Sequence, residues 1–399
     1  MKRPIFLYIL LSVAGIAPSC IEEYNELNSS DDERMLFVEG QIVSQSDCTF
    51  ALRYSVPAGI TSDFANKPVE SAQVMVIGSD GAVFDGRERV PGHYTVSVGQ
   101  LRPEVSYSLR VETKEGTYNS RPMLPLDATD IADLSIEQPR DDRKVDFYVS
   151  TTDPQRTVYY KWDVRETWEI YTPFQCYWTY VFDDPEQFER WIPTLQNQAV
   201  PTGKFMPLGR DYIKNHGWRS IDSHELLYAN NIDYGQSAIE RMCLFQRNGD
   251  DNRFQTRYLA QVRQMAITAE EYEYLHLLTT QSSEMGGLFT PMPSELPGNI
   301  ARTDGSRAIG FIGVRGQVSE REIYVNRRDI DHKDTYKVTT VADSLAQEPP
   351  FMIKKGYSLV DYSPYTNTAT WSYRWTIDCT DPFWGASLQR PDYWQDASL

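Results

Sequence analysis

Histidine is scarce in this chain, and the common catalytic motifs are missing. Only five histidines occur in 399 residues, and they are scattered rather than clustered: His93, His216, His224, His276 and His332. There is no GxSxG nucleophile elbow, no HExxH zinc helix and no Walker phosphate loop. The acidic turn NGDDNR at 248–253 lacks the alternating ligands and the closing glutamate of a calcium loop. We therefore predict a protein that is not an enzyme and that uses no cofactor and no metal ion.

Basic residues are also few. Lysine and arginine together number 39, against 56 aspartates and glutamates, which gives a formal net charge of -17 at pH 7. Proteins that bind nucleic acid neutralise its phosphates with lysine and arginine, and electrostatic docking on anionic lipid needs the same excess. The charge balance argues against both, and we predict that nucleic acid is not a partner.

The N-terminal apolar run, residues 5–17, is too short to cross a membrane, since a spanning helix needs roughly 20 apolar residues. Two basic residues precede it, and small residues and then Cys20 follow, which is the order found in an export signal. The segment resembles a bacterial lipobox. We predict a signal peptide at 1–19 and a lipid on the Cys20 thiol. The alternative is an ordinary secretory signal cut near residue 17, which leaves Cys20 as a free or paired thiol.

Acidic residues follow Cys20 directly. Glu22, Glu23 and Glu26 precede an acidic run at 31–33. Acidic residues at this place resemble the signal that sends Bacteroidota lipoproteins to the outer face of the outer membrane. The other interpretation is a solvated leash, and a segment of this composition is flexible in either case. We predict an acidic tether at 20–34 and a lipid-anchored protein on the extracellular face of the outer membrane.

Four further cysteines allow two disulfides. Exported proteins meet an oxidising environment, and four cysteines can pair in three ways. Cys176 and Cys243 lie in the same aromatic-rich region and are the preferred pair, which leaves Cys48 and Cys379 to join opposite ends of the chain. No CxxC pair and no cysteine–histidine cluster with zinc spacing occurs.

Residues 35–125 read as consecutive short strands separated by turns that contain glycine. The two-residue alternation of apolar side chains recurs at 36–43, 50–54, 72–76, 94–98 and 107–111. This pattern predicts a β-sandwich domain of immunoglobulin or fibronectin type. GHYTV followed by SYSLRV also resembles the last strands of transthyretin-like sandwiches.

From 126 to 399 we predict a larger β-rich domain with a few helices, so the chain as a whole is expected to be mainly β. The proline-bearing segment PMLPLDATD at 122–130 marks the boundary. Strand patterns resume beyond it, at 145–149, 158–169, 308–325 and 373–377. A short helix is expected at 186–191, and a longer one near 268–284, where Thr268 and Glu271 form a capping box.

Two segments are candidates for ligand or partner contact. The aromatic cluster Tyr171, Phe174, Tyr177, Trp178 and Tyr180 offers flat rings that can stack on sugars, and Tyr177 and Trp178 are its candidate contacts. The other interpretation is an aromatic strand pair packed in the core. The loop at 286–300 holds three prolines and three glycines and cannot be helical. Its candidate contacts are Gly286, Gly287, Phe289, Pro293 and Asn299.

Several segments, taken in order, resemble one family. They are VYYKWDVRETWE at 158–169, YLAQVRQMAITAEEYEYLHLL at 258–278, GGLFTPMPSELPGNIA at 286–301, AIGFIGV at 308–314 and DCTDPFWGASLQRPDYW at 378–394. From about residue 36 to its C-terminus the chain resembles the Bacteroidota lipoproteins catalogued as domain of unknown function 4249. Members often carry a CxDC pair near their end, where this chain has Thr376 and keeps only Cys379.

This resemblance implies a surface or outer-membrane lipoprotein, commonly encoded beside a TonB-dependent outer-membrane barrel, and it implies no catalytic residue. We therefore expect a non-enzymatic accessory or binding partner of such a barrel, in nutrient import or envelope assembly. The alternative is a stand-alone surface lipoprotein that binds a glycan or a peptide.

Overall fold

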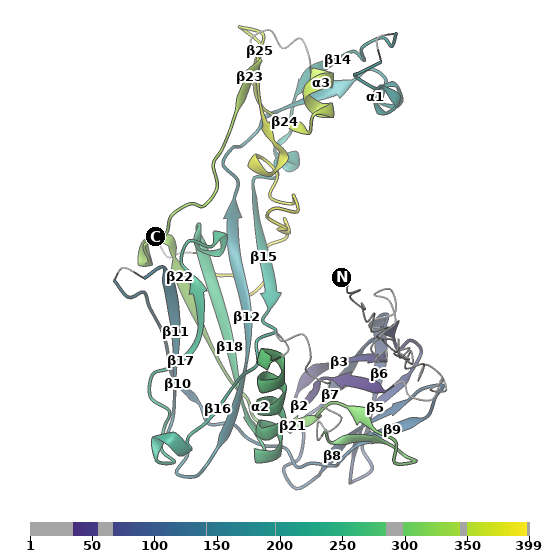
Figure 1. Ribbon diagram of the computed structural model, residues 1–399, viewed down its shortest axis with the longest axis vertical. Coiled ribbons are helices and arrows are strands. Elements are labelled where there is room, and N and C mark those ends of the chain that lie inside the picture. The colour runs from purple at the N-terminus through teal and green to yellow at the C-terminus, as the bar shows by residue number, and fades with distance from the viewer. Residues whose placement is uncertain are drawn as a thin grey trace, which may run out of the picture.

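The protein is elongated and consists of three β-rich parts (Figure 1). The computed structural model describes residues 35–54, 67–140, 142–195, 197–284, 298–343 and 349–396. An N-terminal unit lies beside one end of a pair of central sheets, and a smaller distal unit lies at the other end. The prediction of a mainly β chain is confirmed.

The strands of the N-terminal unit alternate buried and exposed side chains, as their sequences predict. The alternation is clear in β3 (Ser46–Tyr54), β5 (Gln73–Gly78), β7 (His93–Val98) and β8 (Tyr107–Glu112). The other early strands are β1 (Leu36–Glu39), β2 (Gln41–Val43), β4 (Lys67–Pro68), β6 (Val83–Val90) and β9 (Thr117–Ser120). Their apolar faces enclose one core, in which Phe50, Val76 and Leu109 are fully buried.

Three strands from much later in the chain complete this unit. β19 (Ile300–Arg302) pairs with β9, and β20 (Ala308–Ile309) and β21 (Gly313–Arg315) pair in parallel with β1 and β2. The main sheet therefore has the order β19-β9-β8-β5-β6-β7-β3-β1-β20, with β4 beside β3. Ala301 forms a bridge to Arg307, so the two ends of the sheet nearly meet. Strand pairing thus crosses the predicted boundary at residue 125. The sequence did not reveal this pairing, because strands of two or three residues are too short to show a period.

Two sheets form the central part, and they share one core. Their strands are β10 (Ile131–Glu137), β11 (Lys144–Thr151), β12 (Tyr159–Tyr171), β15 (His216–Asp222), β16 (Leu227–Asn230), β17 (Met242–Asn248), β18 (Arg257–Ile267) and β22 (Ser319–Asn326). The larger sheet has the order β15-β12-β18-β22, with β16 also on β12, and the smaller has the order β10-β11-β17. Phe147, Tyr160 and Trp162 are among the side chains buried between them.

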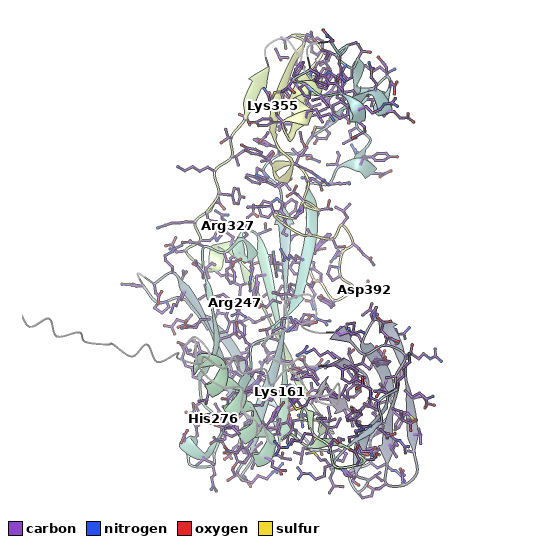
Figure 2. All side chains as sticks on the ribbon, turned by 45° about the vertical axis from the view of Figure 1, so that its right-hand side comes forward. Lys161, Arg247, His276, Arg327, Lys355 and Asp392 are labelled. Carbon is purple, nitrogen blue, oxygen red and sulfur yellow. The ribbon has the colours of Figure 1, made fainter. Side chains whose placement is uncertain are left out.

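Strand β12 has two different faces. Its even-numbered side chains, such as Tyr160, Trp162 and Val164, are buried in the central core. Its odd-numbered side chains Lys161 and Arg165 lie on the opposite face, which looks toward the N-terminal unit, and Figure 2 labels Lys161 beside that unit. The period of two along an extended strand therefore separates a face packed in the central core from a face that borders the N-terminal unit.

Helix α2 (Ala269–Glu284) confirms the helix predicted near 268–284. The Thr268 hydroxyl accepts the backbone N–H of Glu271 at 3.1 Å, which is one half of the predicted capping box. Tyr274 and Leu275 on the helix pack with Phe311, just before β21. The helix therefore lies between the central sheet and the N-terminal unit (Figure 1).

A buried ion pair fastens α2 to the N-terminal unit. Arg315 on β21 is fully buried and donates to the carboxylate of Glu271 on α2. A Cβ added to Gly313 would overlap the Arg315 guanidinium, so glycine makes room for this side chain. Because each charge would be uncompensated without the other, the pair holds β21 and the start of α2 together.

The distal unit combines two chain segments. The first holds β13 (Trp178–Phe182), α1 (Pro185–Arg190) and β14 (Gly203–Pro207), and α1 confirms the short helix predicted at 186–191. The second holds β23 (Val341–Asp343), α3 (Pro349–Lys354), β24 (Tyr357–Ser363) and β25 (Thr368–Tyr373). The predicted strand at 373–377 is wrong, because a 3-10 turn begins at Arg374 and the Thr376 hydroxyl donates to the Tyr373 carbonyl at 2.7 Å.

A buried carboxylate joins the central sheets. Glu166 on β12 is 1% exposed and accepts hydrogen bonds from Arg247 (2.9 and 3.0 Å), Arg253 (2.7 Å) and Tyr258 (2.7 Å). Burial by itself raises the pKa of Glu166, but the hydrogen bonds from Arg247 and Tyr258 and the two guanidinium charges outweigh it and lower the pKa. The ionised form is therefore the one that the fold stabilises.

We expect Arg247→Met to lower the free energy of unfolding by about 3–5 kcal/mol, because it leaves a buried carboxylate short of a counter-charge. Urea denaturation followed by circular dichroism measures the change. The matched control is Arg165→Met, whose partner Asp222 is 66% exposed, and it should cost less than about 1 kcal/mol. Equal losses in the two variants would contradict this account.

The same carboxylate gives stability a pH dependence. Since folding lowers the pKa of Glu166, its contribution is present at neutral pH and is lost as the pH falls below the ordinary glutamate value of 4.5. We expect the wild-type midpoint in urea to fall more steeply between pH 5 and pH 3 than that of Glu166→Gln, which has no group to titrate at this site. Parallel profiles would show that Glu166 does not contribute.

Candidate functional site

The distal unit lies at one end of the elongated molecule, as Figures 1 and 2 show. It exposes a set of large apolar side chains. Nine of them lie in or next to its elements: Tyr177, Val181, Ile192, Leu195, Val200, Met206, Tyr212, Tyr365 and Tyr373. Tyr212 is 69% exposed and Tyr365 is 98% exposed. Exposed apolar side chains that gather in one region mark an interaction surface more often than scattered ones do.

Aromatic contacts hold the β13–β14 hairpin on β24. Phe205 stacks on Tyr362 with ring centroids 3.9 Å apart, and Trp178 meets the same ring edge-on at 5.2 Å. In the described part of the chain, β14 pairs with β13 alone. Its outer backbone groups are therefore free to pair with an added strand, a common mode of peptide recognition.

A pocket of about 330 Å³ opens between the hairpin and β24–β25. Trp178, Tyr357 and Trp371 are among the side chains that line it. Trp371 is fully buried, and its indole N–H has no hydrogen-bond partner among the described residues. The volume lies at the lower end of the roughly 300–1,000 Å³ typical of ligand pockets, so the pocket suits a single ring-sized group.

The structure places the predicted contact residues in different regions. Trp178 is half-buried and lines the distal pocket, and Tyr177 beside it is 53% exposed. Asn299 lies in the N-terminal unit instead, where its side-chain amide bonds to the backbone N–H and carbonyl of Ile312 at 2.8 and 2.9 Å. The remaining candidates fall outside the described residues: Cys20, Gly286, Gly287, Phe289 and Pro293.

Tyr212 and Trp371 also line this pocket, and no pattern in the sequence predicted that they would. Tyr212 ends a single 3-10 turn, and Trp371 lies within the short strand β25, far along the chain from Trp178. A lone aromatic residue in a turn or short strand has no period that reveals what it faces. Only the packing of the two distal segments brings Trp371 beside Trp178 in one pocket.

None of the four cysteines in the described ranges forms a disulfide. The predicted Cys176–Cys243 pair is not formed, because Cys176 packs in the distal core and Cys243 lies on β17 in the centre. The predicted Cys48–Cys379 pair is not formed either. The Cys48 thiol donates to the Val43 carbonyl in the N-terminal unit, whereas Cys379 is buried in the central core. Burial raises the pKa of all four thiols, and that of Cys379 to about 11.

The acidic turn at 248–253 is neutralised by basic neighbours. Asp250 pairs with Arg143 and accepts the backbone N–H of Lys333 at 2.8 Å, and the Arg143 hydrogen bond is the main reason that the pKa of Asp250 is lowered. Within the described ranges, no three His, Cys, Asp or Glu side chains are grouped so that they could hold a metal ion. No helix in those ranges is both long and apolar enough to cross a membrane.

We expect iodoacetamide to label Cys48, Cys176, Cys243 and Cys379 in the unfolded protein without prior reduction, because the four thiols are free. In the native protein at pH 8, Cys243 should react first, since it is exposed and the other three are buried. Peptide mapping by mass spectrometry measures both results. Labelling of the unfolded chain that requires a reductant would contradict the structure.

Comparison with known proteins identifies a family for this chain. A family model described as a domain of unknown function (DUF4249) matches residues 21–321. The match includes the segments at 158–169, 258–278, 286–301 and 308–314, and it ends before the one at 378–394. None of the curated proteins compared with the chain matches it. Because the match covers well over half of its residues, the chain belongs to the DUF4249 family.

Proposed function

We propose that this protein is a lipid-anchored protein on the outer face of the outer membrane. It acts by binding rather than by catalysis, as an accessory partner of a TonB-dependent barrel in nutrient import or envelope assembly. The observation that carries the proposal is the group of exposed aromatic and aliphatic side chains on the distal unit. In a chain with a net charge of -17, these side chains form a surface suited to a protein partner.

The lipid on Cys20 supports the same proposal through concentration. An anchor confines the protein to the plane of the membrane, which raises its effective concentration beside any barrel in that membrane. The tether at 20–34 can extend to at most about 50 Å, since a fully extended chain spans roughly 3.3–3.6 Å per residue. The folded body therefore stays within reach of its neighbours, and a weak contact by the distal unit is sufficient.

We also propose that the N-terminal unit is a variant of the immunoglobulin, fibronectin or transthyretin-like sandwich. Consecutive antiparallel pairs, β5 with β6, β6 with β7 and β3 with β7, support this assignment, as does the alternation of buried side chains. The strands β19 and β20 at its two ends are additions to that plan. In this arrangement the sandwich supports the central sheets, and the distal unit makes the contact with the barrel.

We expect the double substitution Tyr177→Ser and Tyr212→Ser to reduce recovery of the barrel at least tenfold. Aromatic anchors at an interface contribute about 1–2 kcal/mol or more each when they are buried by a partner. The measurement is quantitative mass spectrometry after crosslinking and pull-down from intact envelopes.

The matched control for this experiment is Val83→Ser with Val90→Ser, which removes two side chains that are 54% and 55% exposed in the N-terminal unit. This control should recover the barrel at the wild-type level. A wild-type pull-down without any barrel, or equal recovery with both double variants, would refute the docking proposal.

The anchor has a separate test. We expect Cys20→Ala to abolish incorporation of radiolabelled palmitate and to release the protein from the membrane fraction, because the thiol is the attachment point. In intact cells, the wild-type protein should be digested by added proteinase K while a periplasmic marker survives. Wild-type protein that takes up no label and stays soluble would overturn the localisation.

A further inference from the structure

A cleft of about 1110 Å³ separates the N-terminal unit from the central sheet. One wall is the outer face of β12, β18 and β22, and the other is formed by β1, β2 and β3, with α2 contributing to one end. Lys161, which Figure 2 labels, belongs to the sheet wall. The cleft exceeds the roughly 300–1,000 Å³ of small-molecule pockets, so its size suits an oligomer rather than a single small ring.

The walls are densely charged, and eight of the charged side chains form four ion pairs. The pairs are Arg165–Asp222 (2.7 Å), Arg263–Glu320 (2.6 Å) and Lys161–Asp163 (3.5 Å) on the sheet wall, and Arg53–Glu39 (3.8 Å) opposite. A strongly charged ligand would have to break these pairs. A neutral ligand with many hydroxyl groups leaves them intact and can bond to the remaining lone pairs and N–H groups.

Polar atoms at the α2 end of the cleft lack partners among the described residues. Glu271 is 4% exposed, and its Oε2 has no hydrogen bond, although the residue lines the cleft. Gln41 also lines the cleft; its Nε2 donates to Asp163 at 2.9 Å, while its Oε1 is buried without a partner. Arg315, paired with Glu271, keeps Nε and Nη1 unpartnered. Buried polar atoms of this kind favour a ligand that both donates and accepts hydrogen bonds.

The cleft presents side chains rather than backbone. β12 and β18 are interior strands with neighbours on both edges, so their N–H and C=O groups are already paired. A peptide that binds by adding a strand finds no free edge on either of these two strands. Apolar rings lie at the same end as the polar atoms, since Tyr274 and Phe311 line the cleft with centroids 5.6 Å apart. Carbohydrates match this combination, because a sugar has an apolar face and a rim of hydroxyls.

We infer that the cleft is a binding site for a neutral oligosaccharide, with Gln41 and Glu271 accepting hydrogen bonds from its hydroxyls and Arg263 contacting it from the sheet wall. The site is distinct from the distal surface proposed to dock on a barrel. A protein with both would hold a glycan at one end of its body and its membrane partner at the other. The cleft proposal does not require the barrel contact.

The test is isothermal titration calorimetry of the full-length lipoprotein in a polyoxyethylene detergent, which carries no sugar headgroup. The probes are maltohexaose, cellohexaose, mannohexaose and chitohexaose, with hexagalacturonate and a glycine–serine hexapeptide for comparison. We expect at least one neutral hexasaccharide to bind. Gln41→Leu and Arg263→Ala should each weaken that binding about tenfold, because each removes a polar contact to the ligand.

The matched control is Arg241→Ala, which removes an arginine of similar exposure from an ion pair with Glu137 outside the cleft, and it should leave binding unchanged. The Arg263 side chain is 40% exposed, so its variant should fold, and thermal unfolding verifies this. Tyr177→Ser with Tyr212→Ser should keep glycan binding whether or not it loses the barrel. The inference is overturned if no neutral hexasaccharide binds, if a comparison probe binds more tightly, or if the two cleft variants bind like the control.

Discussion

The structure depends on one long strand whose two faces lie in different environments, the central core and the cleft. β12 runs for 13 residues, and it pairs with β15, β16 and β18. Its even-numbered side chains fill the central core and include Glu166, whose buried charge is met by Arg247 from the facing sheet. Three of its odd-numbered side chains, Lys161, Asp163 and Arg165, form part of the charged wall of the cleft. Since successive side chains alternate between faces, shifting the register by one residue would place charges in the core and tryptophans in the cleft.

The joint between the N-terminal unit and the central sheets is made by a chain segment that returns from far along the sequence. Strands β19, β20 and β21 add to the N-terminal unit, and Arg315 at the end of β21 is buried against Glu271 at the start of α2. A buried pair is costly to break from either side, so it keeps the two parts together. The width of the cleft follows from this joint, because its two walls belong to the two parts that the joint connects.

The distal unit differs from the other two parts, because its core is small and rich in aromatic side chains. Phe205, Tyr362 and Trp178 contact one another by ring stacking and edge contacts, and few aliphatic side chains stand behind them. A unit of this size cannot cover all its apolar side chains, because surface grows relative to volume as a fold becomes smaller. Several of its tyrosines therefore stay exposed, and in the proposed function these are the side chains that contact a partner.

Local patterns in the sequence determined the secondary structure and the faces of the strands. Alternation revealed β5, β7, β8 and β12, and the Thr268 and Glu271 spacing marked α2, because periodicity and capping depend on neighbours along the chain. Contacts between distant segments carry no such mark. Tertiary packing alone decided three features. Strands β19, β20 and β21 pair with the N-terminal strands, Trp178 and Trp371 line one pocket, and the four cysteines lie apart. The physical reason is that these contacts depend on which apolar faces cover each other in space, and many arrangements of the same strands satisfy the same local pattern.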